Sequence, residues 1–546
     1  MSKTLRGADI VARSLEQLGA TKIFTLSGNH IMSLFDAALD TKLDLVHVRH
    51  EAACVHMADA WGRLTGEPGI AWVTGGPGHA NAVGALYTAL AQESPMVLLS
   101  GHAMTTEIGR GGFQEIRQAD MAAPVTKASW TAQSAATLGE DIARAMRIAT
   151  TGRHGPVHVS LPSDLLEDTV GANAVRWPAA GAPDATSRPM PAAIADAILS
   201  ELAAASRPLI LVGPQMAAPK RRGLAAELEQ ATNVPVVFMD SVRGVRDATL
   251  GAYADVLRRA DLLVLIGKPL DYTLNWAAPP TVDADCRLIV VDPQGSIAER
   301  AQKEKGGAVA FACVADAPAS IRTLIDSAGR RAPRPAQWRQ EVRTALDSRP
   351  SAWNEIKSQT AGRLHPAEVF RTLKPYVERD PNTVLICDGG EFSQWSQAML
   401  RSSRRLINGI AGAIGPGVPF AIAARCIEPK APVIAVLGDG TFGFHMSEFD
   451  TAVRNNLPFI AILGNDACWN AESQIQLREY GRDRMHGCNL LPTRYDQAVA
   501  ALGGHGEMVD NLAALPGAFE RALASGKPAC INIMTESIAA PTVRSS

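Results

Sequence analysis

The sequence predicts an α/β fold built from doubly wound parallel sheets. Short apolar runs such as 432–437 and 458–463 are typical of strands buried on both faces. Amphipathic helical patterns separate these runs, and helical crossovers make successive strands parallel. The chain has 546 residues, which is too many for a single core, so several such domains are expected.

Three stretches repeat this alternation of strands and helices, and we predict domains at 1–175, 190–335 and 360–546. A Pro- and Ala-rich segment at 177–191 is typical of a linker between the first two. The predicted strands are 22–26, 43–48, 70–74, 96–100 and 157–161, then 209–212, 236–238, 262–266 and 288–291, and finally 383–387, 432–437, 458–463 and 529–534.

Composition excludes several classes of function. Lys and Arg number 53 against 55 Asp and Glu, so the net charge of −2 argues against nucleic acid or an anionic membrane as a partner. No apolar run approaches the length of a membrane span. The N-terminus is an amphipathic helix pattern rather than a signal peptide, and the eight scattered cysteines form no CxxC pair. A reduced, cytoplasmic protein is therefore expected.

The stretch 431–470 organises the rest of the chain. A buried strand ends at Gly438-Asp439-Gly440, Ser447 opens a helix with Asp450 as a capping-box-like partner, and a second buried strand ends near Asn465. This is a βαβ unit, so Asp439 and Asn465 are predicted at the carboxyl ends of neighbouring parallel strands. Ligands bind at that edge in open α/β sheets.

Oxygen ligands at this edge suit a hard divalent ion such as Mg²⁺. Gly438 and Gly440 leave room for phosphate oxygens to approach backbone N–H groups. The combination predicts Mg²⁺ bridging a diphosphate to the protein. The alternative for GDG alone is an ordinary tight turn that contains Asp.

The GDG motif, followed after one βαβ unit by Asn, resembles the thiamin-diphosphate signature. The chain is similar to the superfamily that includes acetolactate synthase, benzaldehyde lyase, 2-hydroxyacyl-CoA lyase and oxalyl-CoA decarboxylase, which implies three domains of the thiamin-diphosphate-binding fold. The resemblance implies that Mg²⁺ is held by Asp439, the side chain of Asn465 and the carbonyl of Ala467. It also implies cofactor contacts at Gly412, Ile414, Gly438, Gly440 and Thr441.

Two of these implied contacts concern the aminopyrimidine ring of the cofactor. They lie in NGIAGAIGPGVPFAIAAR (408–425), where many glycines precede a helix and indicate close approach of the backbone to a ligand. By resemblance the Gly412 carbonyl accepts from the ring's amine, and Ile414 wedges beneath the bent cofactor. A core role for Ile414 is the alternative, and the two roles are compatible.

Glu51 stands where a predicted strand passes into a helix. By itself an acidic residue in a first helical turn is simply favourable with the helix dipole. The surrounding VRHEAACVHMADAWGRLTGEPGIAWVTGGPGHAN resembles the pyrimidine-binding domain of thiamin-diphosphate enzymes, which implies that Glu51 is the activating carboxyl. Hydrogen-bonded to the aminopyrimidine, a largely desolvated carboxyl exchanges a proton with the ring near neutral pH.

Two further residues are predicted to face the substrate. His30, in LSGNHIMSLFDAAL, resembles benzaldehyde lyase, which implies a proton relay for a substrate hydroxyl, since imidazole accepts and donates near pH 7. Gln114 matches a family glutamine near the substrate carbonyl. The alternatives are a locally bonded histidine at a helix start and a solvated loop glutamine.

The central domain carries no Gly-rich phosphate fingerprint, since VGPQM (212–216) is a poor match to G-x-G-x-x-G. A domain without ligand is therefore one alternative. By resemblance it is the domain that holds FAD or ADP in some relatives, and Asp292 ends a strand where an acid would bind ribose. GKPLDY lacks the arginine of the synthase pattern, which argues against FAD and leaves ADP as the expected nucleotide.

The resemblance implies a Mg²⁺- and thiamin-diphosphate-dependent lyase or carboligase acting on 2-hydroxy ketones or 2-hydroxyacyl-CoA thioesters through a C2 ylide and an enamine. The alternatives are an acetolactate-synthase-like transferase on 2-oxo acids and an oxalyl-CoA-type decarboxylase. A non-catalytic cofactor-binding relative is more remote, because Glu51, Asp439 and Asn465 are all present. The substrate is a small aldehyde, ketone or acyl-CoA, and the resemblance implies a homodimer or homotetramer with active sites at the subunit interface.

Overall fold

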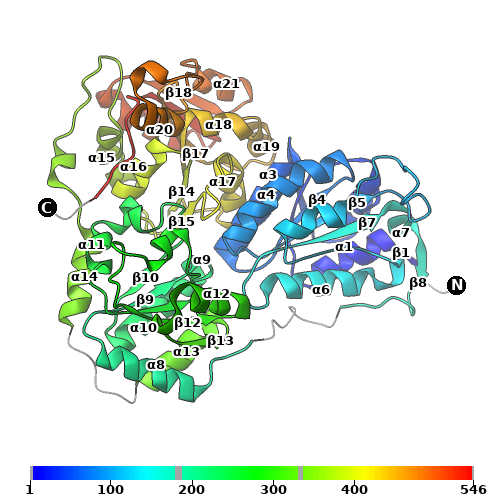
Figure 1. Cartoon of the computed structure of the whole chain (residues 1–546). Coiled ribbons are helices and arrows are strands. Elements are labelled where there is room, and N and C mark those ends of the chain that lie inside the picture. Colours follow the sequence, from blue (N-terminus) through cyan, green and yellow to red (C-terminus); the bar gives the residue numbers. More distant parts are fainter. Residues whose placement is uncertain (1–3, 179–186, 330–335, 544–546) are drawn as a thin grey trace. The chain divides into compact units, whose positions relative to one another are not determined.

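The computed structural model describes residues 4–178, 187–329 and 336–543, and its chain packs into two compact units. The first comprises Met1–Thr186 with Ile422–Ile427 and Ser447–Leu457, and the second comprises the remainder. The described strands form three parallel sheets, of six, five and six strands, and a short antiparallel pair (Figure 1). The predicted fold class is therefore confirmed.

The sheet of the first unit has the order β3-β2-β4-β5-β7-β6, and every neighbouring pair is parallel. Its strands are β2 (Lys22–Thr25), β3 (Asp44–His47), β4 (Gly69–Val73), β5 (Met96–His102), β6 (Ala128–Thr131) and β7 (Pro156–Pro162). The main core joins this sheet to α1 (Gly7–Gln17), α2 (Met32–Ala38) and α6 (Leu138–Thr150). The helices α3 (Glu51–Thr65) and α4 (Pro77–Ala91) pack against each other.

Two boundaries in this unit bear on the prediction. Helix α3 ends at Gly66, in left-handed conformation, as the sequence pattern predicts. Helix α4 begins at Pro77, because proline at the first helical position has no N–H to leave unpaired. Strand β6 was not predicted, and its four residues are all only half-buried, as at a sheet edge.

The central sheet has the order β10-β9-β11-β12-β13. Its strands are β9 (Pro208–Val212), β10 (Val236–Phe238), β11 (Leu262–Ile266), β12 (Arg287–Asp292) and β13 (Val309–Val314). One face packs on α8 (Ala192–Ala204), α10 (Pro219–Thr232) and α13 (Ala317–Ala328), and the other on α11 (Tyr253–Leu257), α12 (Gly295–Lys305) and α14 (Gln337–Asp347). The predicted parallel strands are present, and Asp292 ends β12 with a fully buried side chain.

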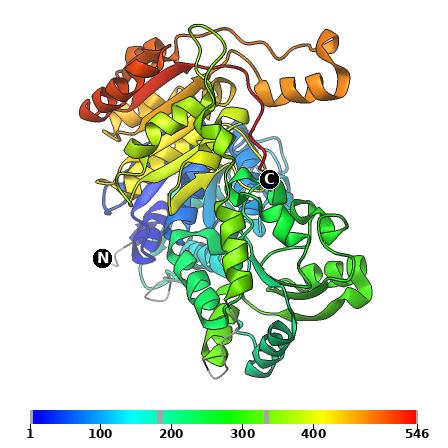
Figure 2. The same ribbon diagram turned by 90° about the vertical axis from the view of Figure 1, so that its left-hand side faces the viewer.

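The last sheet has the order β15-β14-β16-β17-β19-β18. Its strands are β14 (Val384–Asp388), β15 (Arg404–Ile407), β16 (Val433–Gly438), β17 (Ile460–Asn465), β18 (His505–Val509) and β19 (Ala529–Met534). One face packs on α15 (Pro366–Val377), α16 (Glu391–Met399) and α22 (Leu515–Ala524). Helix α20 (Asn470–Tyr480), orange in Figure 2, and the segment after it stand away from this sheet.

The crossover between β16 and β17 differs from the predicted single helix. It contains α18 (Asp439–His445) and α19 (Glu448–Arg454), with a break at Met446-Ser447. The predicted capping box is wrong, because the Ser447 side chain makes no cap hydrogen bond. Asp450 instead accepts from Arg454 at 2.8 Å, since an i,i+4 ion pair is available within the helix.

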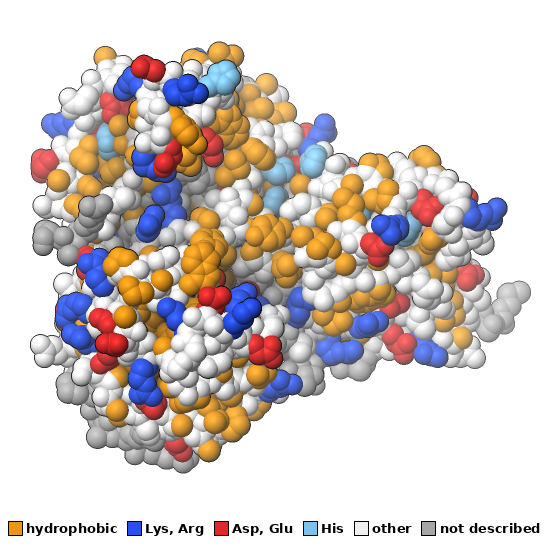
Figure 3. All heavy atoms as spheres, viewed as in Figure 1, with side chains coloured by type: hydrophobic (Ala, Val, Ile, Leu, Met, Phe, Trp, Pro, Cys, Tyr) orange, Lys and Arg blue, Asp and Glu red, His pale blue; other side chains and the backbone are white. Residues whose placement is uncertain are grey.

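Surface and linker predictions have mixed outcomes. On the face that Figure 3 shows, Lys and Arg side chains are interspersed with Asp and Glu, in keeping with the near-zero net charge. In the described part of the chain, every helix is too short or too polar to cross a bilayer. Much of the predicted linker at 177–191 lies outside the described residues.

Candidate active site

In the second unit, Asp439 and Asn465 lie at the same sheet edge. Strands β16 and β17 are parallel neighbours, and their register pairs Gly438 with Gly464. The next residue on each strand is therefore Asp439 or Asn465. The predicted geometry follows from local sequence, because a short crossover between adjacent buried strands leaves their carboxyl ends together.

The orientation of Asn465 leaves one oxygen available. Its amide nitrogen donates to the Thr493 carbonyl at 2.9 Å and to Asn532 Oδ1 at 3.1 Å. Asn465 Oδ1 and Asp439 Oδ2 are both buried without a hydrogen-bond partner among the described residues. Buried oxygen atoms of this kind are costly unless a ligand or ion binds them. The residues therefore fit a hard divalent cation.

Asp466, which sequence reasoning did not single out, adds a second carboxylate. Burial raises the pKa of both Asp439 and Asp466, and the charge of Asp439 raises that of Asp466 further. Two carboxylates this close repel each other unless a proton or a cation lies between them. Since no three His, Cys, Asp or Glu side chains converge in the described residues, a metal here needs mixed donors such as these acids with Asn465.

Ala467 has the left-handed φ of +58°, which is uncommon for a residue with a Cβ. Its carbonyl accepts from the Leu490 N–H at 2.7 Å, so one lone pair of that oxygen remains for a further contact. The strained turn and the Leu490 contact fix the direction of this carbonyl. Its role as a metal ligand stays a prediction.

A cavity of about 210 Å³ opens beside these residues. Of the predicted site residues, its lining includes Gly412, Ile414, Gly438, Asp439, Gly440 and Thr441, but not Asn465 or Ala467. A Cβ on Gly440 would stand 2.6 Å from the Trp469 ring, so only glycine fits there. The backbone at Gly440 is thus held close to the cavity.

Asp388 holds the glycine-rich loop of this cavity in place. Its carboxylate accepts from the N–H groups of Gly415 at 3.1 Å and Gly417 at 2.7 Å. Burial raises the pKa of Asp388 to about 6. Gly412, in the same loop, has a φ of +65°, and a Cβ there would stand 3.0 Å from Val242. Sequence reasoning missed Asp388, although this residue directly follows the predicted strand 383–387, much as Asp439 follows the predicted strand 432–437.

In the first unit, Glu51 begins α3 with a half-buried side chain. Its Oε2 accepts from Asn81 Nδ2 of α4 at 3.0 Å. A Cβ on Gly78 would stand 3.2 Å from Glu51 Oε1. The start of α4 therefore approaches the carboxyl closely, and Asn81 sets its orientation.

Thr74 links the Glu51 region to His30. A Cβ on Gly78 would stand 2.7 Å from Thr74 Cγ2, and His30 Nδ1 lies 3.1 Å from Thr74 Oγ1. His30 Nε2 lies 3.2 Å from the Phe113 carbonyl, and the two rings stack with centroids 5.7 Å apart. Burial lowers the pKa of His30. Neutral imidazole satisfies both contacts when Nε2 donates to the carbonyl and Nδ1 accepts from the hydroxyl.

Gln114 lies on the other side of the same turn. It has a φ of +56°, and its carbonyl would stand 2.5 Å from a Cβ on Gly76. Gln118, which sequence reasoning missed, is fully buried and accepts from the Gly76 N–H at 2.9 Å while donating to the Gly101 carbonyl at 3.0 Å. The turn at 74–78 therefore brings together the regions of Glu51, His30 and Gln114.

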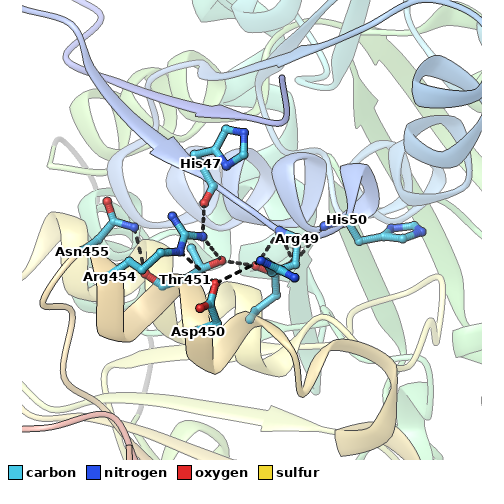
Figure 4. A network of polar contacts seen from close by, with 8 residues as sticks. His47, Arg49, His50, Asp450, Thr451, Arg454 and Asn455 are labelled. Atoms are coloured by element: carbon cyan, nitrogen blue, oxygen red, sulfur yellow. Dashed lines mark hydrogen bonds and ion pairs between the residues drawn. The ribbon is translucent and has the colours of Figure 1, made fainter. Parts of the chain in front are cut away.

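Glu448 of α19 also belongs to the first unit and was missed. Its fully buried carboxylate accepts from the N–H groups of Arg49, at 3.0 Å, and His50, at 3.1 Å. These amides immediately precede Glu51. Figure 4 shows the contacts around them, in which Arg454 donates to the His47 carbonyl at 2.7 Å.

Known proteins resemble the chain over its whole length. A family model described as the thiamine pyrophosphate enzyme N-terminal TPP binding domain matches residues 5–121, and one for the C-terminal TPP binding domain matches 388–533. The acetolactate synthase large subunit IlvG of Mycobacterium tuberculosis is 32% identical, covering 99% of this chain and 98% of its own. The 2-hydroxyacyl-CoA lyase 2 of Caenorhabditis elegans is 30% identical, covering 92% and 84%. The acetolactate synthase of Bacillus subtilis is 28% identical, covering 93% and 90%.

These matches agree with what the two units contain. One has a carboxyl at a helix start, and the other has a GDG turn beside Asn465, with one buried oxygen on Asp439 and one on Asn465 that lack a hydrogen-bond partner in the described residues. The chain belongs to the family of thiamine pyrophosphate enzymes.

Proposed function

We propose that this enzyme makes or breaks a carbon–carbon bond in 2-hydroxy ketones or 2-hydroxyacyl-CoA thioesters, with Mg²⁺ as its metal. The observation that carries the proposal is His30, buried at the turn that also adjoins Glu51 and held neutral by its surroundings. Cleavage of a 2-hydroxy ketone requires a base that takes the hydroxyl proton, and neutral imidazole suits that step.

Each residue has a defined task in this proposal. When bound, thiamin diphosphate supplies a nucleophilic carbon and an electron sink. Glu51, oriented by Asn81, holds a proton at the aminopyrimidine. Asp439 and Asn465 would hold Mg²⁺ through the oxygens that have no hydrogen-bond partner in the described residues, with the Ala467 carbonyl as a further ligand.

His30 and Gln114 act on the substrate side. His30 Nε2 contacts the carbonyl of Phe113, a residue whose side chain is 63% exposed. When a substrate hydroxyl takes the place of this carbonyl, the ring adopts its other neutral tautomer. Nδ1 then donates to Thr74 Oγ1, and the lone pair of Nε2 takes the hydroxyl proton. In this proposal Gln114, on the adjacent turn, donates a hydrogen bond to a substrate carbonyl. Several relatives are named 2-hydroxyacyl-CoA lyase 2, which supports this substrate class.

A second candidate is an acetolactate-synthase-like transferase on 2-oxo acids. The relative from Mycobacterium tuberculosis, which covers almost the whole chain, favours it. The two candidates differ in the bond that breaks first, since a 2-oxo acid loses CO₂ and a 2-hydroxy ketone releases an aldehyde.

A substrate panel separates the candidates. Purified protein with Mg²⁺ and thiamin diphosphate is assayed on benzoin-type ketones, 2-hydroxyacyl-CoA thioesters, oxalyl-CoA and pyruvate. Aldehyde release from the first two supports the lyase, and turnover of pyruvate alone with CO₂ release refutes it. A flavin absorbance spectrum at stoichiometric level also favours the synthase. A homodimer or homotetramer, a cytoplasmic location and ADP in the central domain stay predictions.

A further inference from the structure

A second cavity, of about 230 Å³, lies in the second unit beside the edge strand β10. It is lined by β10, α14, the C-terminal end of α16 and the start of β15. It shares no lining residue with the cavity of about 210 Å³ beside Asp439, which we call the cofactor cavity. Its charged lining residues are Arg222, Arg343, Arg401, Arg405, Asp240 and Asp347. Arginine therefore exceeds carboxylate around this cavity.

Three of these arginines have carboxylate partners and one has none. Arg343 pairs with Glu229, Arg401 with Asp347 at 3.1 Å, and Arg405 with Asp240 at 3.5 Å. The fourth, Arg222, has no ion-pair partner among the described residues.

The environment of Arg222 is short of negative charge. Its Nε donates to the Ala217 carbonyl at 2.8 Å, and its guanidinium lies 4.8 Å from the centroid of Phe238. Burial lowers the pKa of Arg222; Asp240 opposes this effect, and Arg405 reinforces it. A guanidinium in this position gains from an added anion.

Gln397 of α16 provides an independent observation. Its side chain lines the same cavity, is 2% exposed, and has neither Nε2 nor Oε1 hydrogen-bonded in the described part of the chain. Buried side-chain amides nearly always have a partner, so an amide with both ends unsatisfied indicates a missing ligand. That ligand must accept a hydrogen bond from Nε2 and donate one to Oε1.

We propose that this cavity is a binding site for a small phosphate, either inorganic phosphate or a compact phosphorylated metabolite that carries a hydroxyl. Phosphate oxygens accept from the guanidinium of Arg222 and from Gln397 Nε2, and the hydroxyl donates to Gln397 Oε1. Guanidinium recognises phosphate through paired N–H donors. Cavities for drug-sized ligands begin at about 300 Å³, so this smaller one excludes a full dinucleotide.

The site lies on a helix that also borders the cofactor cavity. Glu391, Phe392 and Gln394 near the start of α16 line the cofactor cavity, and Gln397, one turn later, lines the phosphate cavity. An anion bound at Gln397 thus contacts the same rigid element. The proposal concerns binding alone and stands or falls independently of the substrate of the enzyme.

The test is isothermal titration of inorganic phosphate into the full-length protein in phosphate-free buffer. We expect saturable binding that weakens at least about tenfold in Arg222→Met and in Gln397→Leu. Matched controls are Arg322→Met, an exposed arginine paired with Glu227, and Gln359→Leu, an exposed glutamine; both keep wild-type binding. The proposal is overturned if the wild type shows no saturable binding, or if the two cavity variants bind phosphate as tightly as the wild type.

Two further measurements keep the result clear. Gln397→Glu keeps the size of the side chain and adds a carboxylate near Arg222, so it folds normally and loses phosphate binding; retained binding contradicts the proposal. Sulfate has no hydroxyl proton at neutral pH, so we expect weaker binding than for phosphate. Equal affinity for sulfate refutes the donor contact to Gln397 Oε1, and glycerol phosphate tests the organic source.

Discussion

Asp439 and Asn465 follow register partners on adjacent parallel strands, and each keeps one buried oxygen without a partner in the described residues. Neither oxygen is exposed to bulk water, and both stand at the edge where α18 begins. A buried polar atom left unpaired costs about 1 to 3 kcal/mol. This unsatisfied pair is the structural reason to expect a cation at the GDG turn.

Asn465→Ala removes one of these oxygens, and we expect the apparent affinity for thiamin diphosphate with Mg²⁺ to fall at least about tenfold. Fluorescence titration of the cofactor at fixed Mg²⁺ measures the change. Asn382→Ala, at an exposed loop position, serves as the control. Unchanged affinity in Asn465→Ala would show that this side chain does not hold the metal.

Glu51→Gln keeps the contact with Asn81 but cannot exchange a proton with the cofactor ring. We expect turnover to fall by about 10²-fold or more, while cofactor affinity changes little. Steady-state kinetics and cofactor titration on the same preparation separate the two effects. Glu67→Gln, an exposed residue just beyond the other end of α3, keeps full activity. Normal turnover in Glu51→Gln would refute the assigned role.

Glu448→Ala leaves the N–H groups of Arg49 and His50 without their acceptor. Because two N–H groups lose a buried, charged acceptor together, we expect the free energy of unfolding to fall by about 2 to 4 kcal/mol. Denaturant unfolding monitored by circular dichroism gives this value. Glu448→Gln keeps an accepting oxygen and loses less. Equal stability of the alanine variant and the wild type would contradict the role of the carboxylate.

The pH dependence of His30 follows from its burial. Burial lowers the pKa of His30 from 6.5, so the unfolded chain binds the proton more readily than the folded protein. His30 therefore imposes no penalty above pH 6.5, and it reduces stability increasingly as the pH falls below that value. Histidine titration by NMR should give a midpoint below 6.5. In Phe113→Ala the His30 ring loses its cover, so its titration midpoint should move closer to 6.5. An unchanged midpoint would show that burial under Phe113 does not lower the pKa of His30.

His30→Ala tests the proton relay itself. We expect cleavage of a hydroxy ketone to slow by about 10²- to 10⁴-fold, the range that general acid–base groups contribute. Cofactor affinity, measured alongside, should stay within about twofold, since His30 contacts Thr74 and Phe113. A wild-type rate on the same substrate would remove the relay and, with it, the main support for the lyase.

The central strands were predictable because of their composition. Strands β11 and β19 lie inside their sheets and have the predicted bounds, and each is a short, largely apolar run. The edge strands β6, β15 and β18 were missed because half-buried residues such as those of β18 show no continuous apolar run. The order of the strands within each sheet could not be predicted, because it depends on which apolar segments pack against each other in the folded chain.

Local sequence by itself determined the placement of Asp439 beside Asn465, since one crossover joins two neighbouring strands and leaves little freedom. Tertiary structure alone decided the parts played by Glu448 and Gln397. Glu448 bonds to amides some 400 positions earlier in the chain, as its sequence separation of 399 from Arg49 shows. Gln397 of α16 lines one cavity together with Arg222 of α10, a helix about 170 positions earlier in the chain. Such pairings depend on how distant elements pack, and no local pattern of residues encodes them.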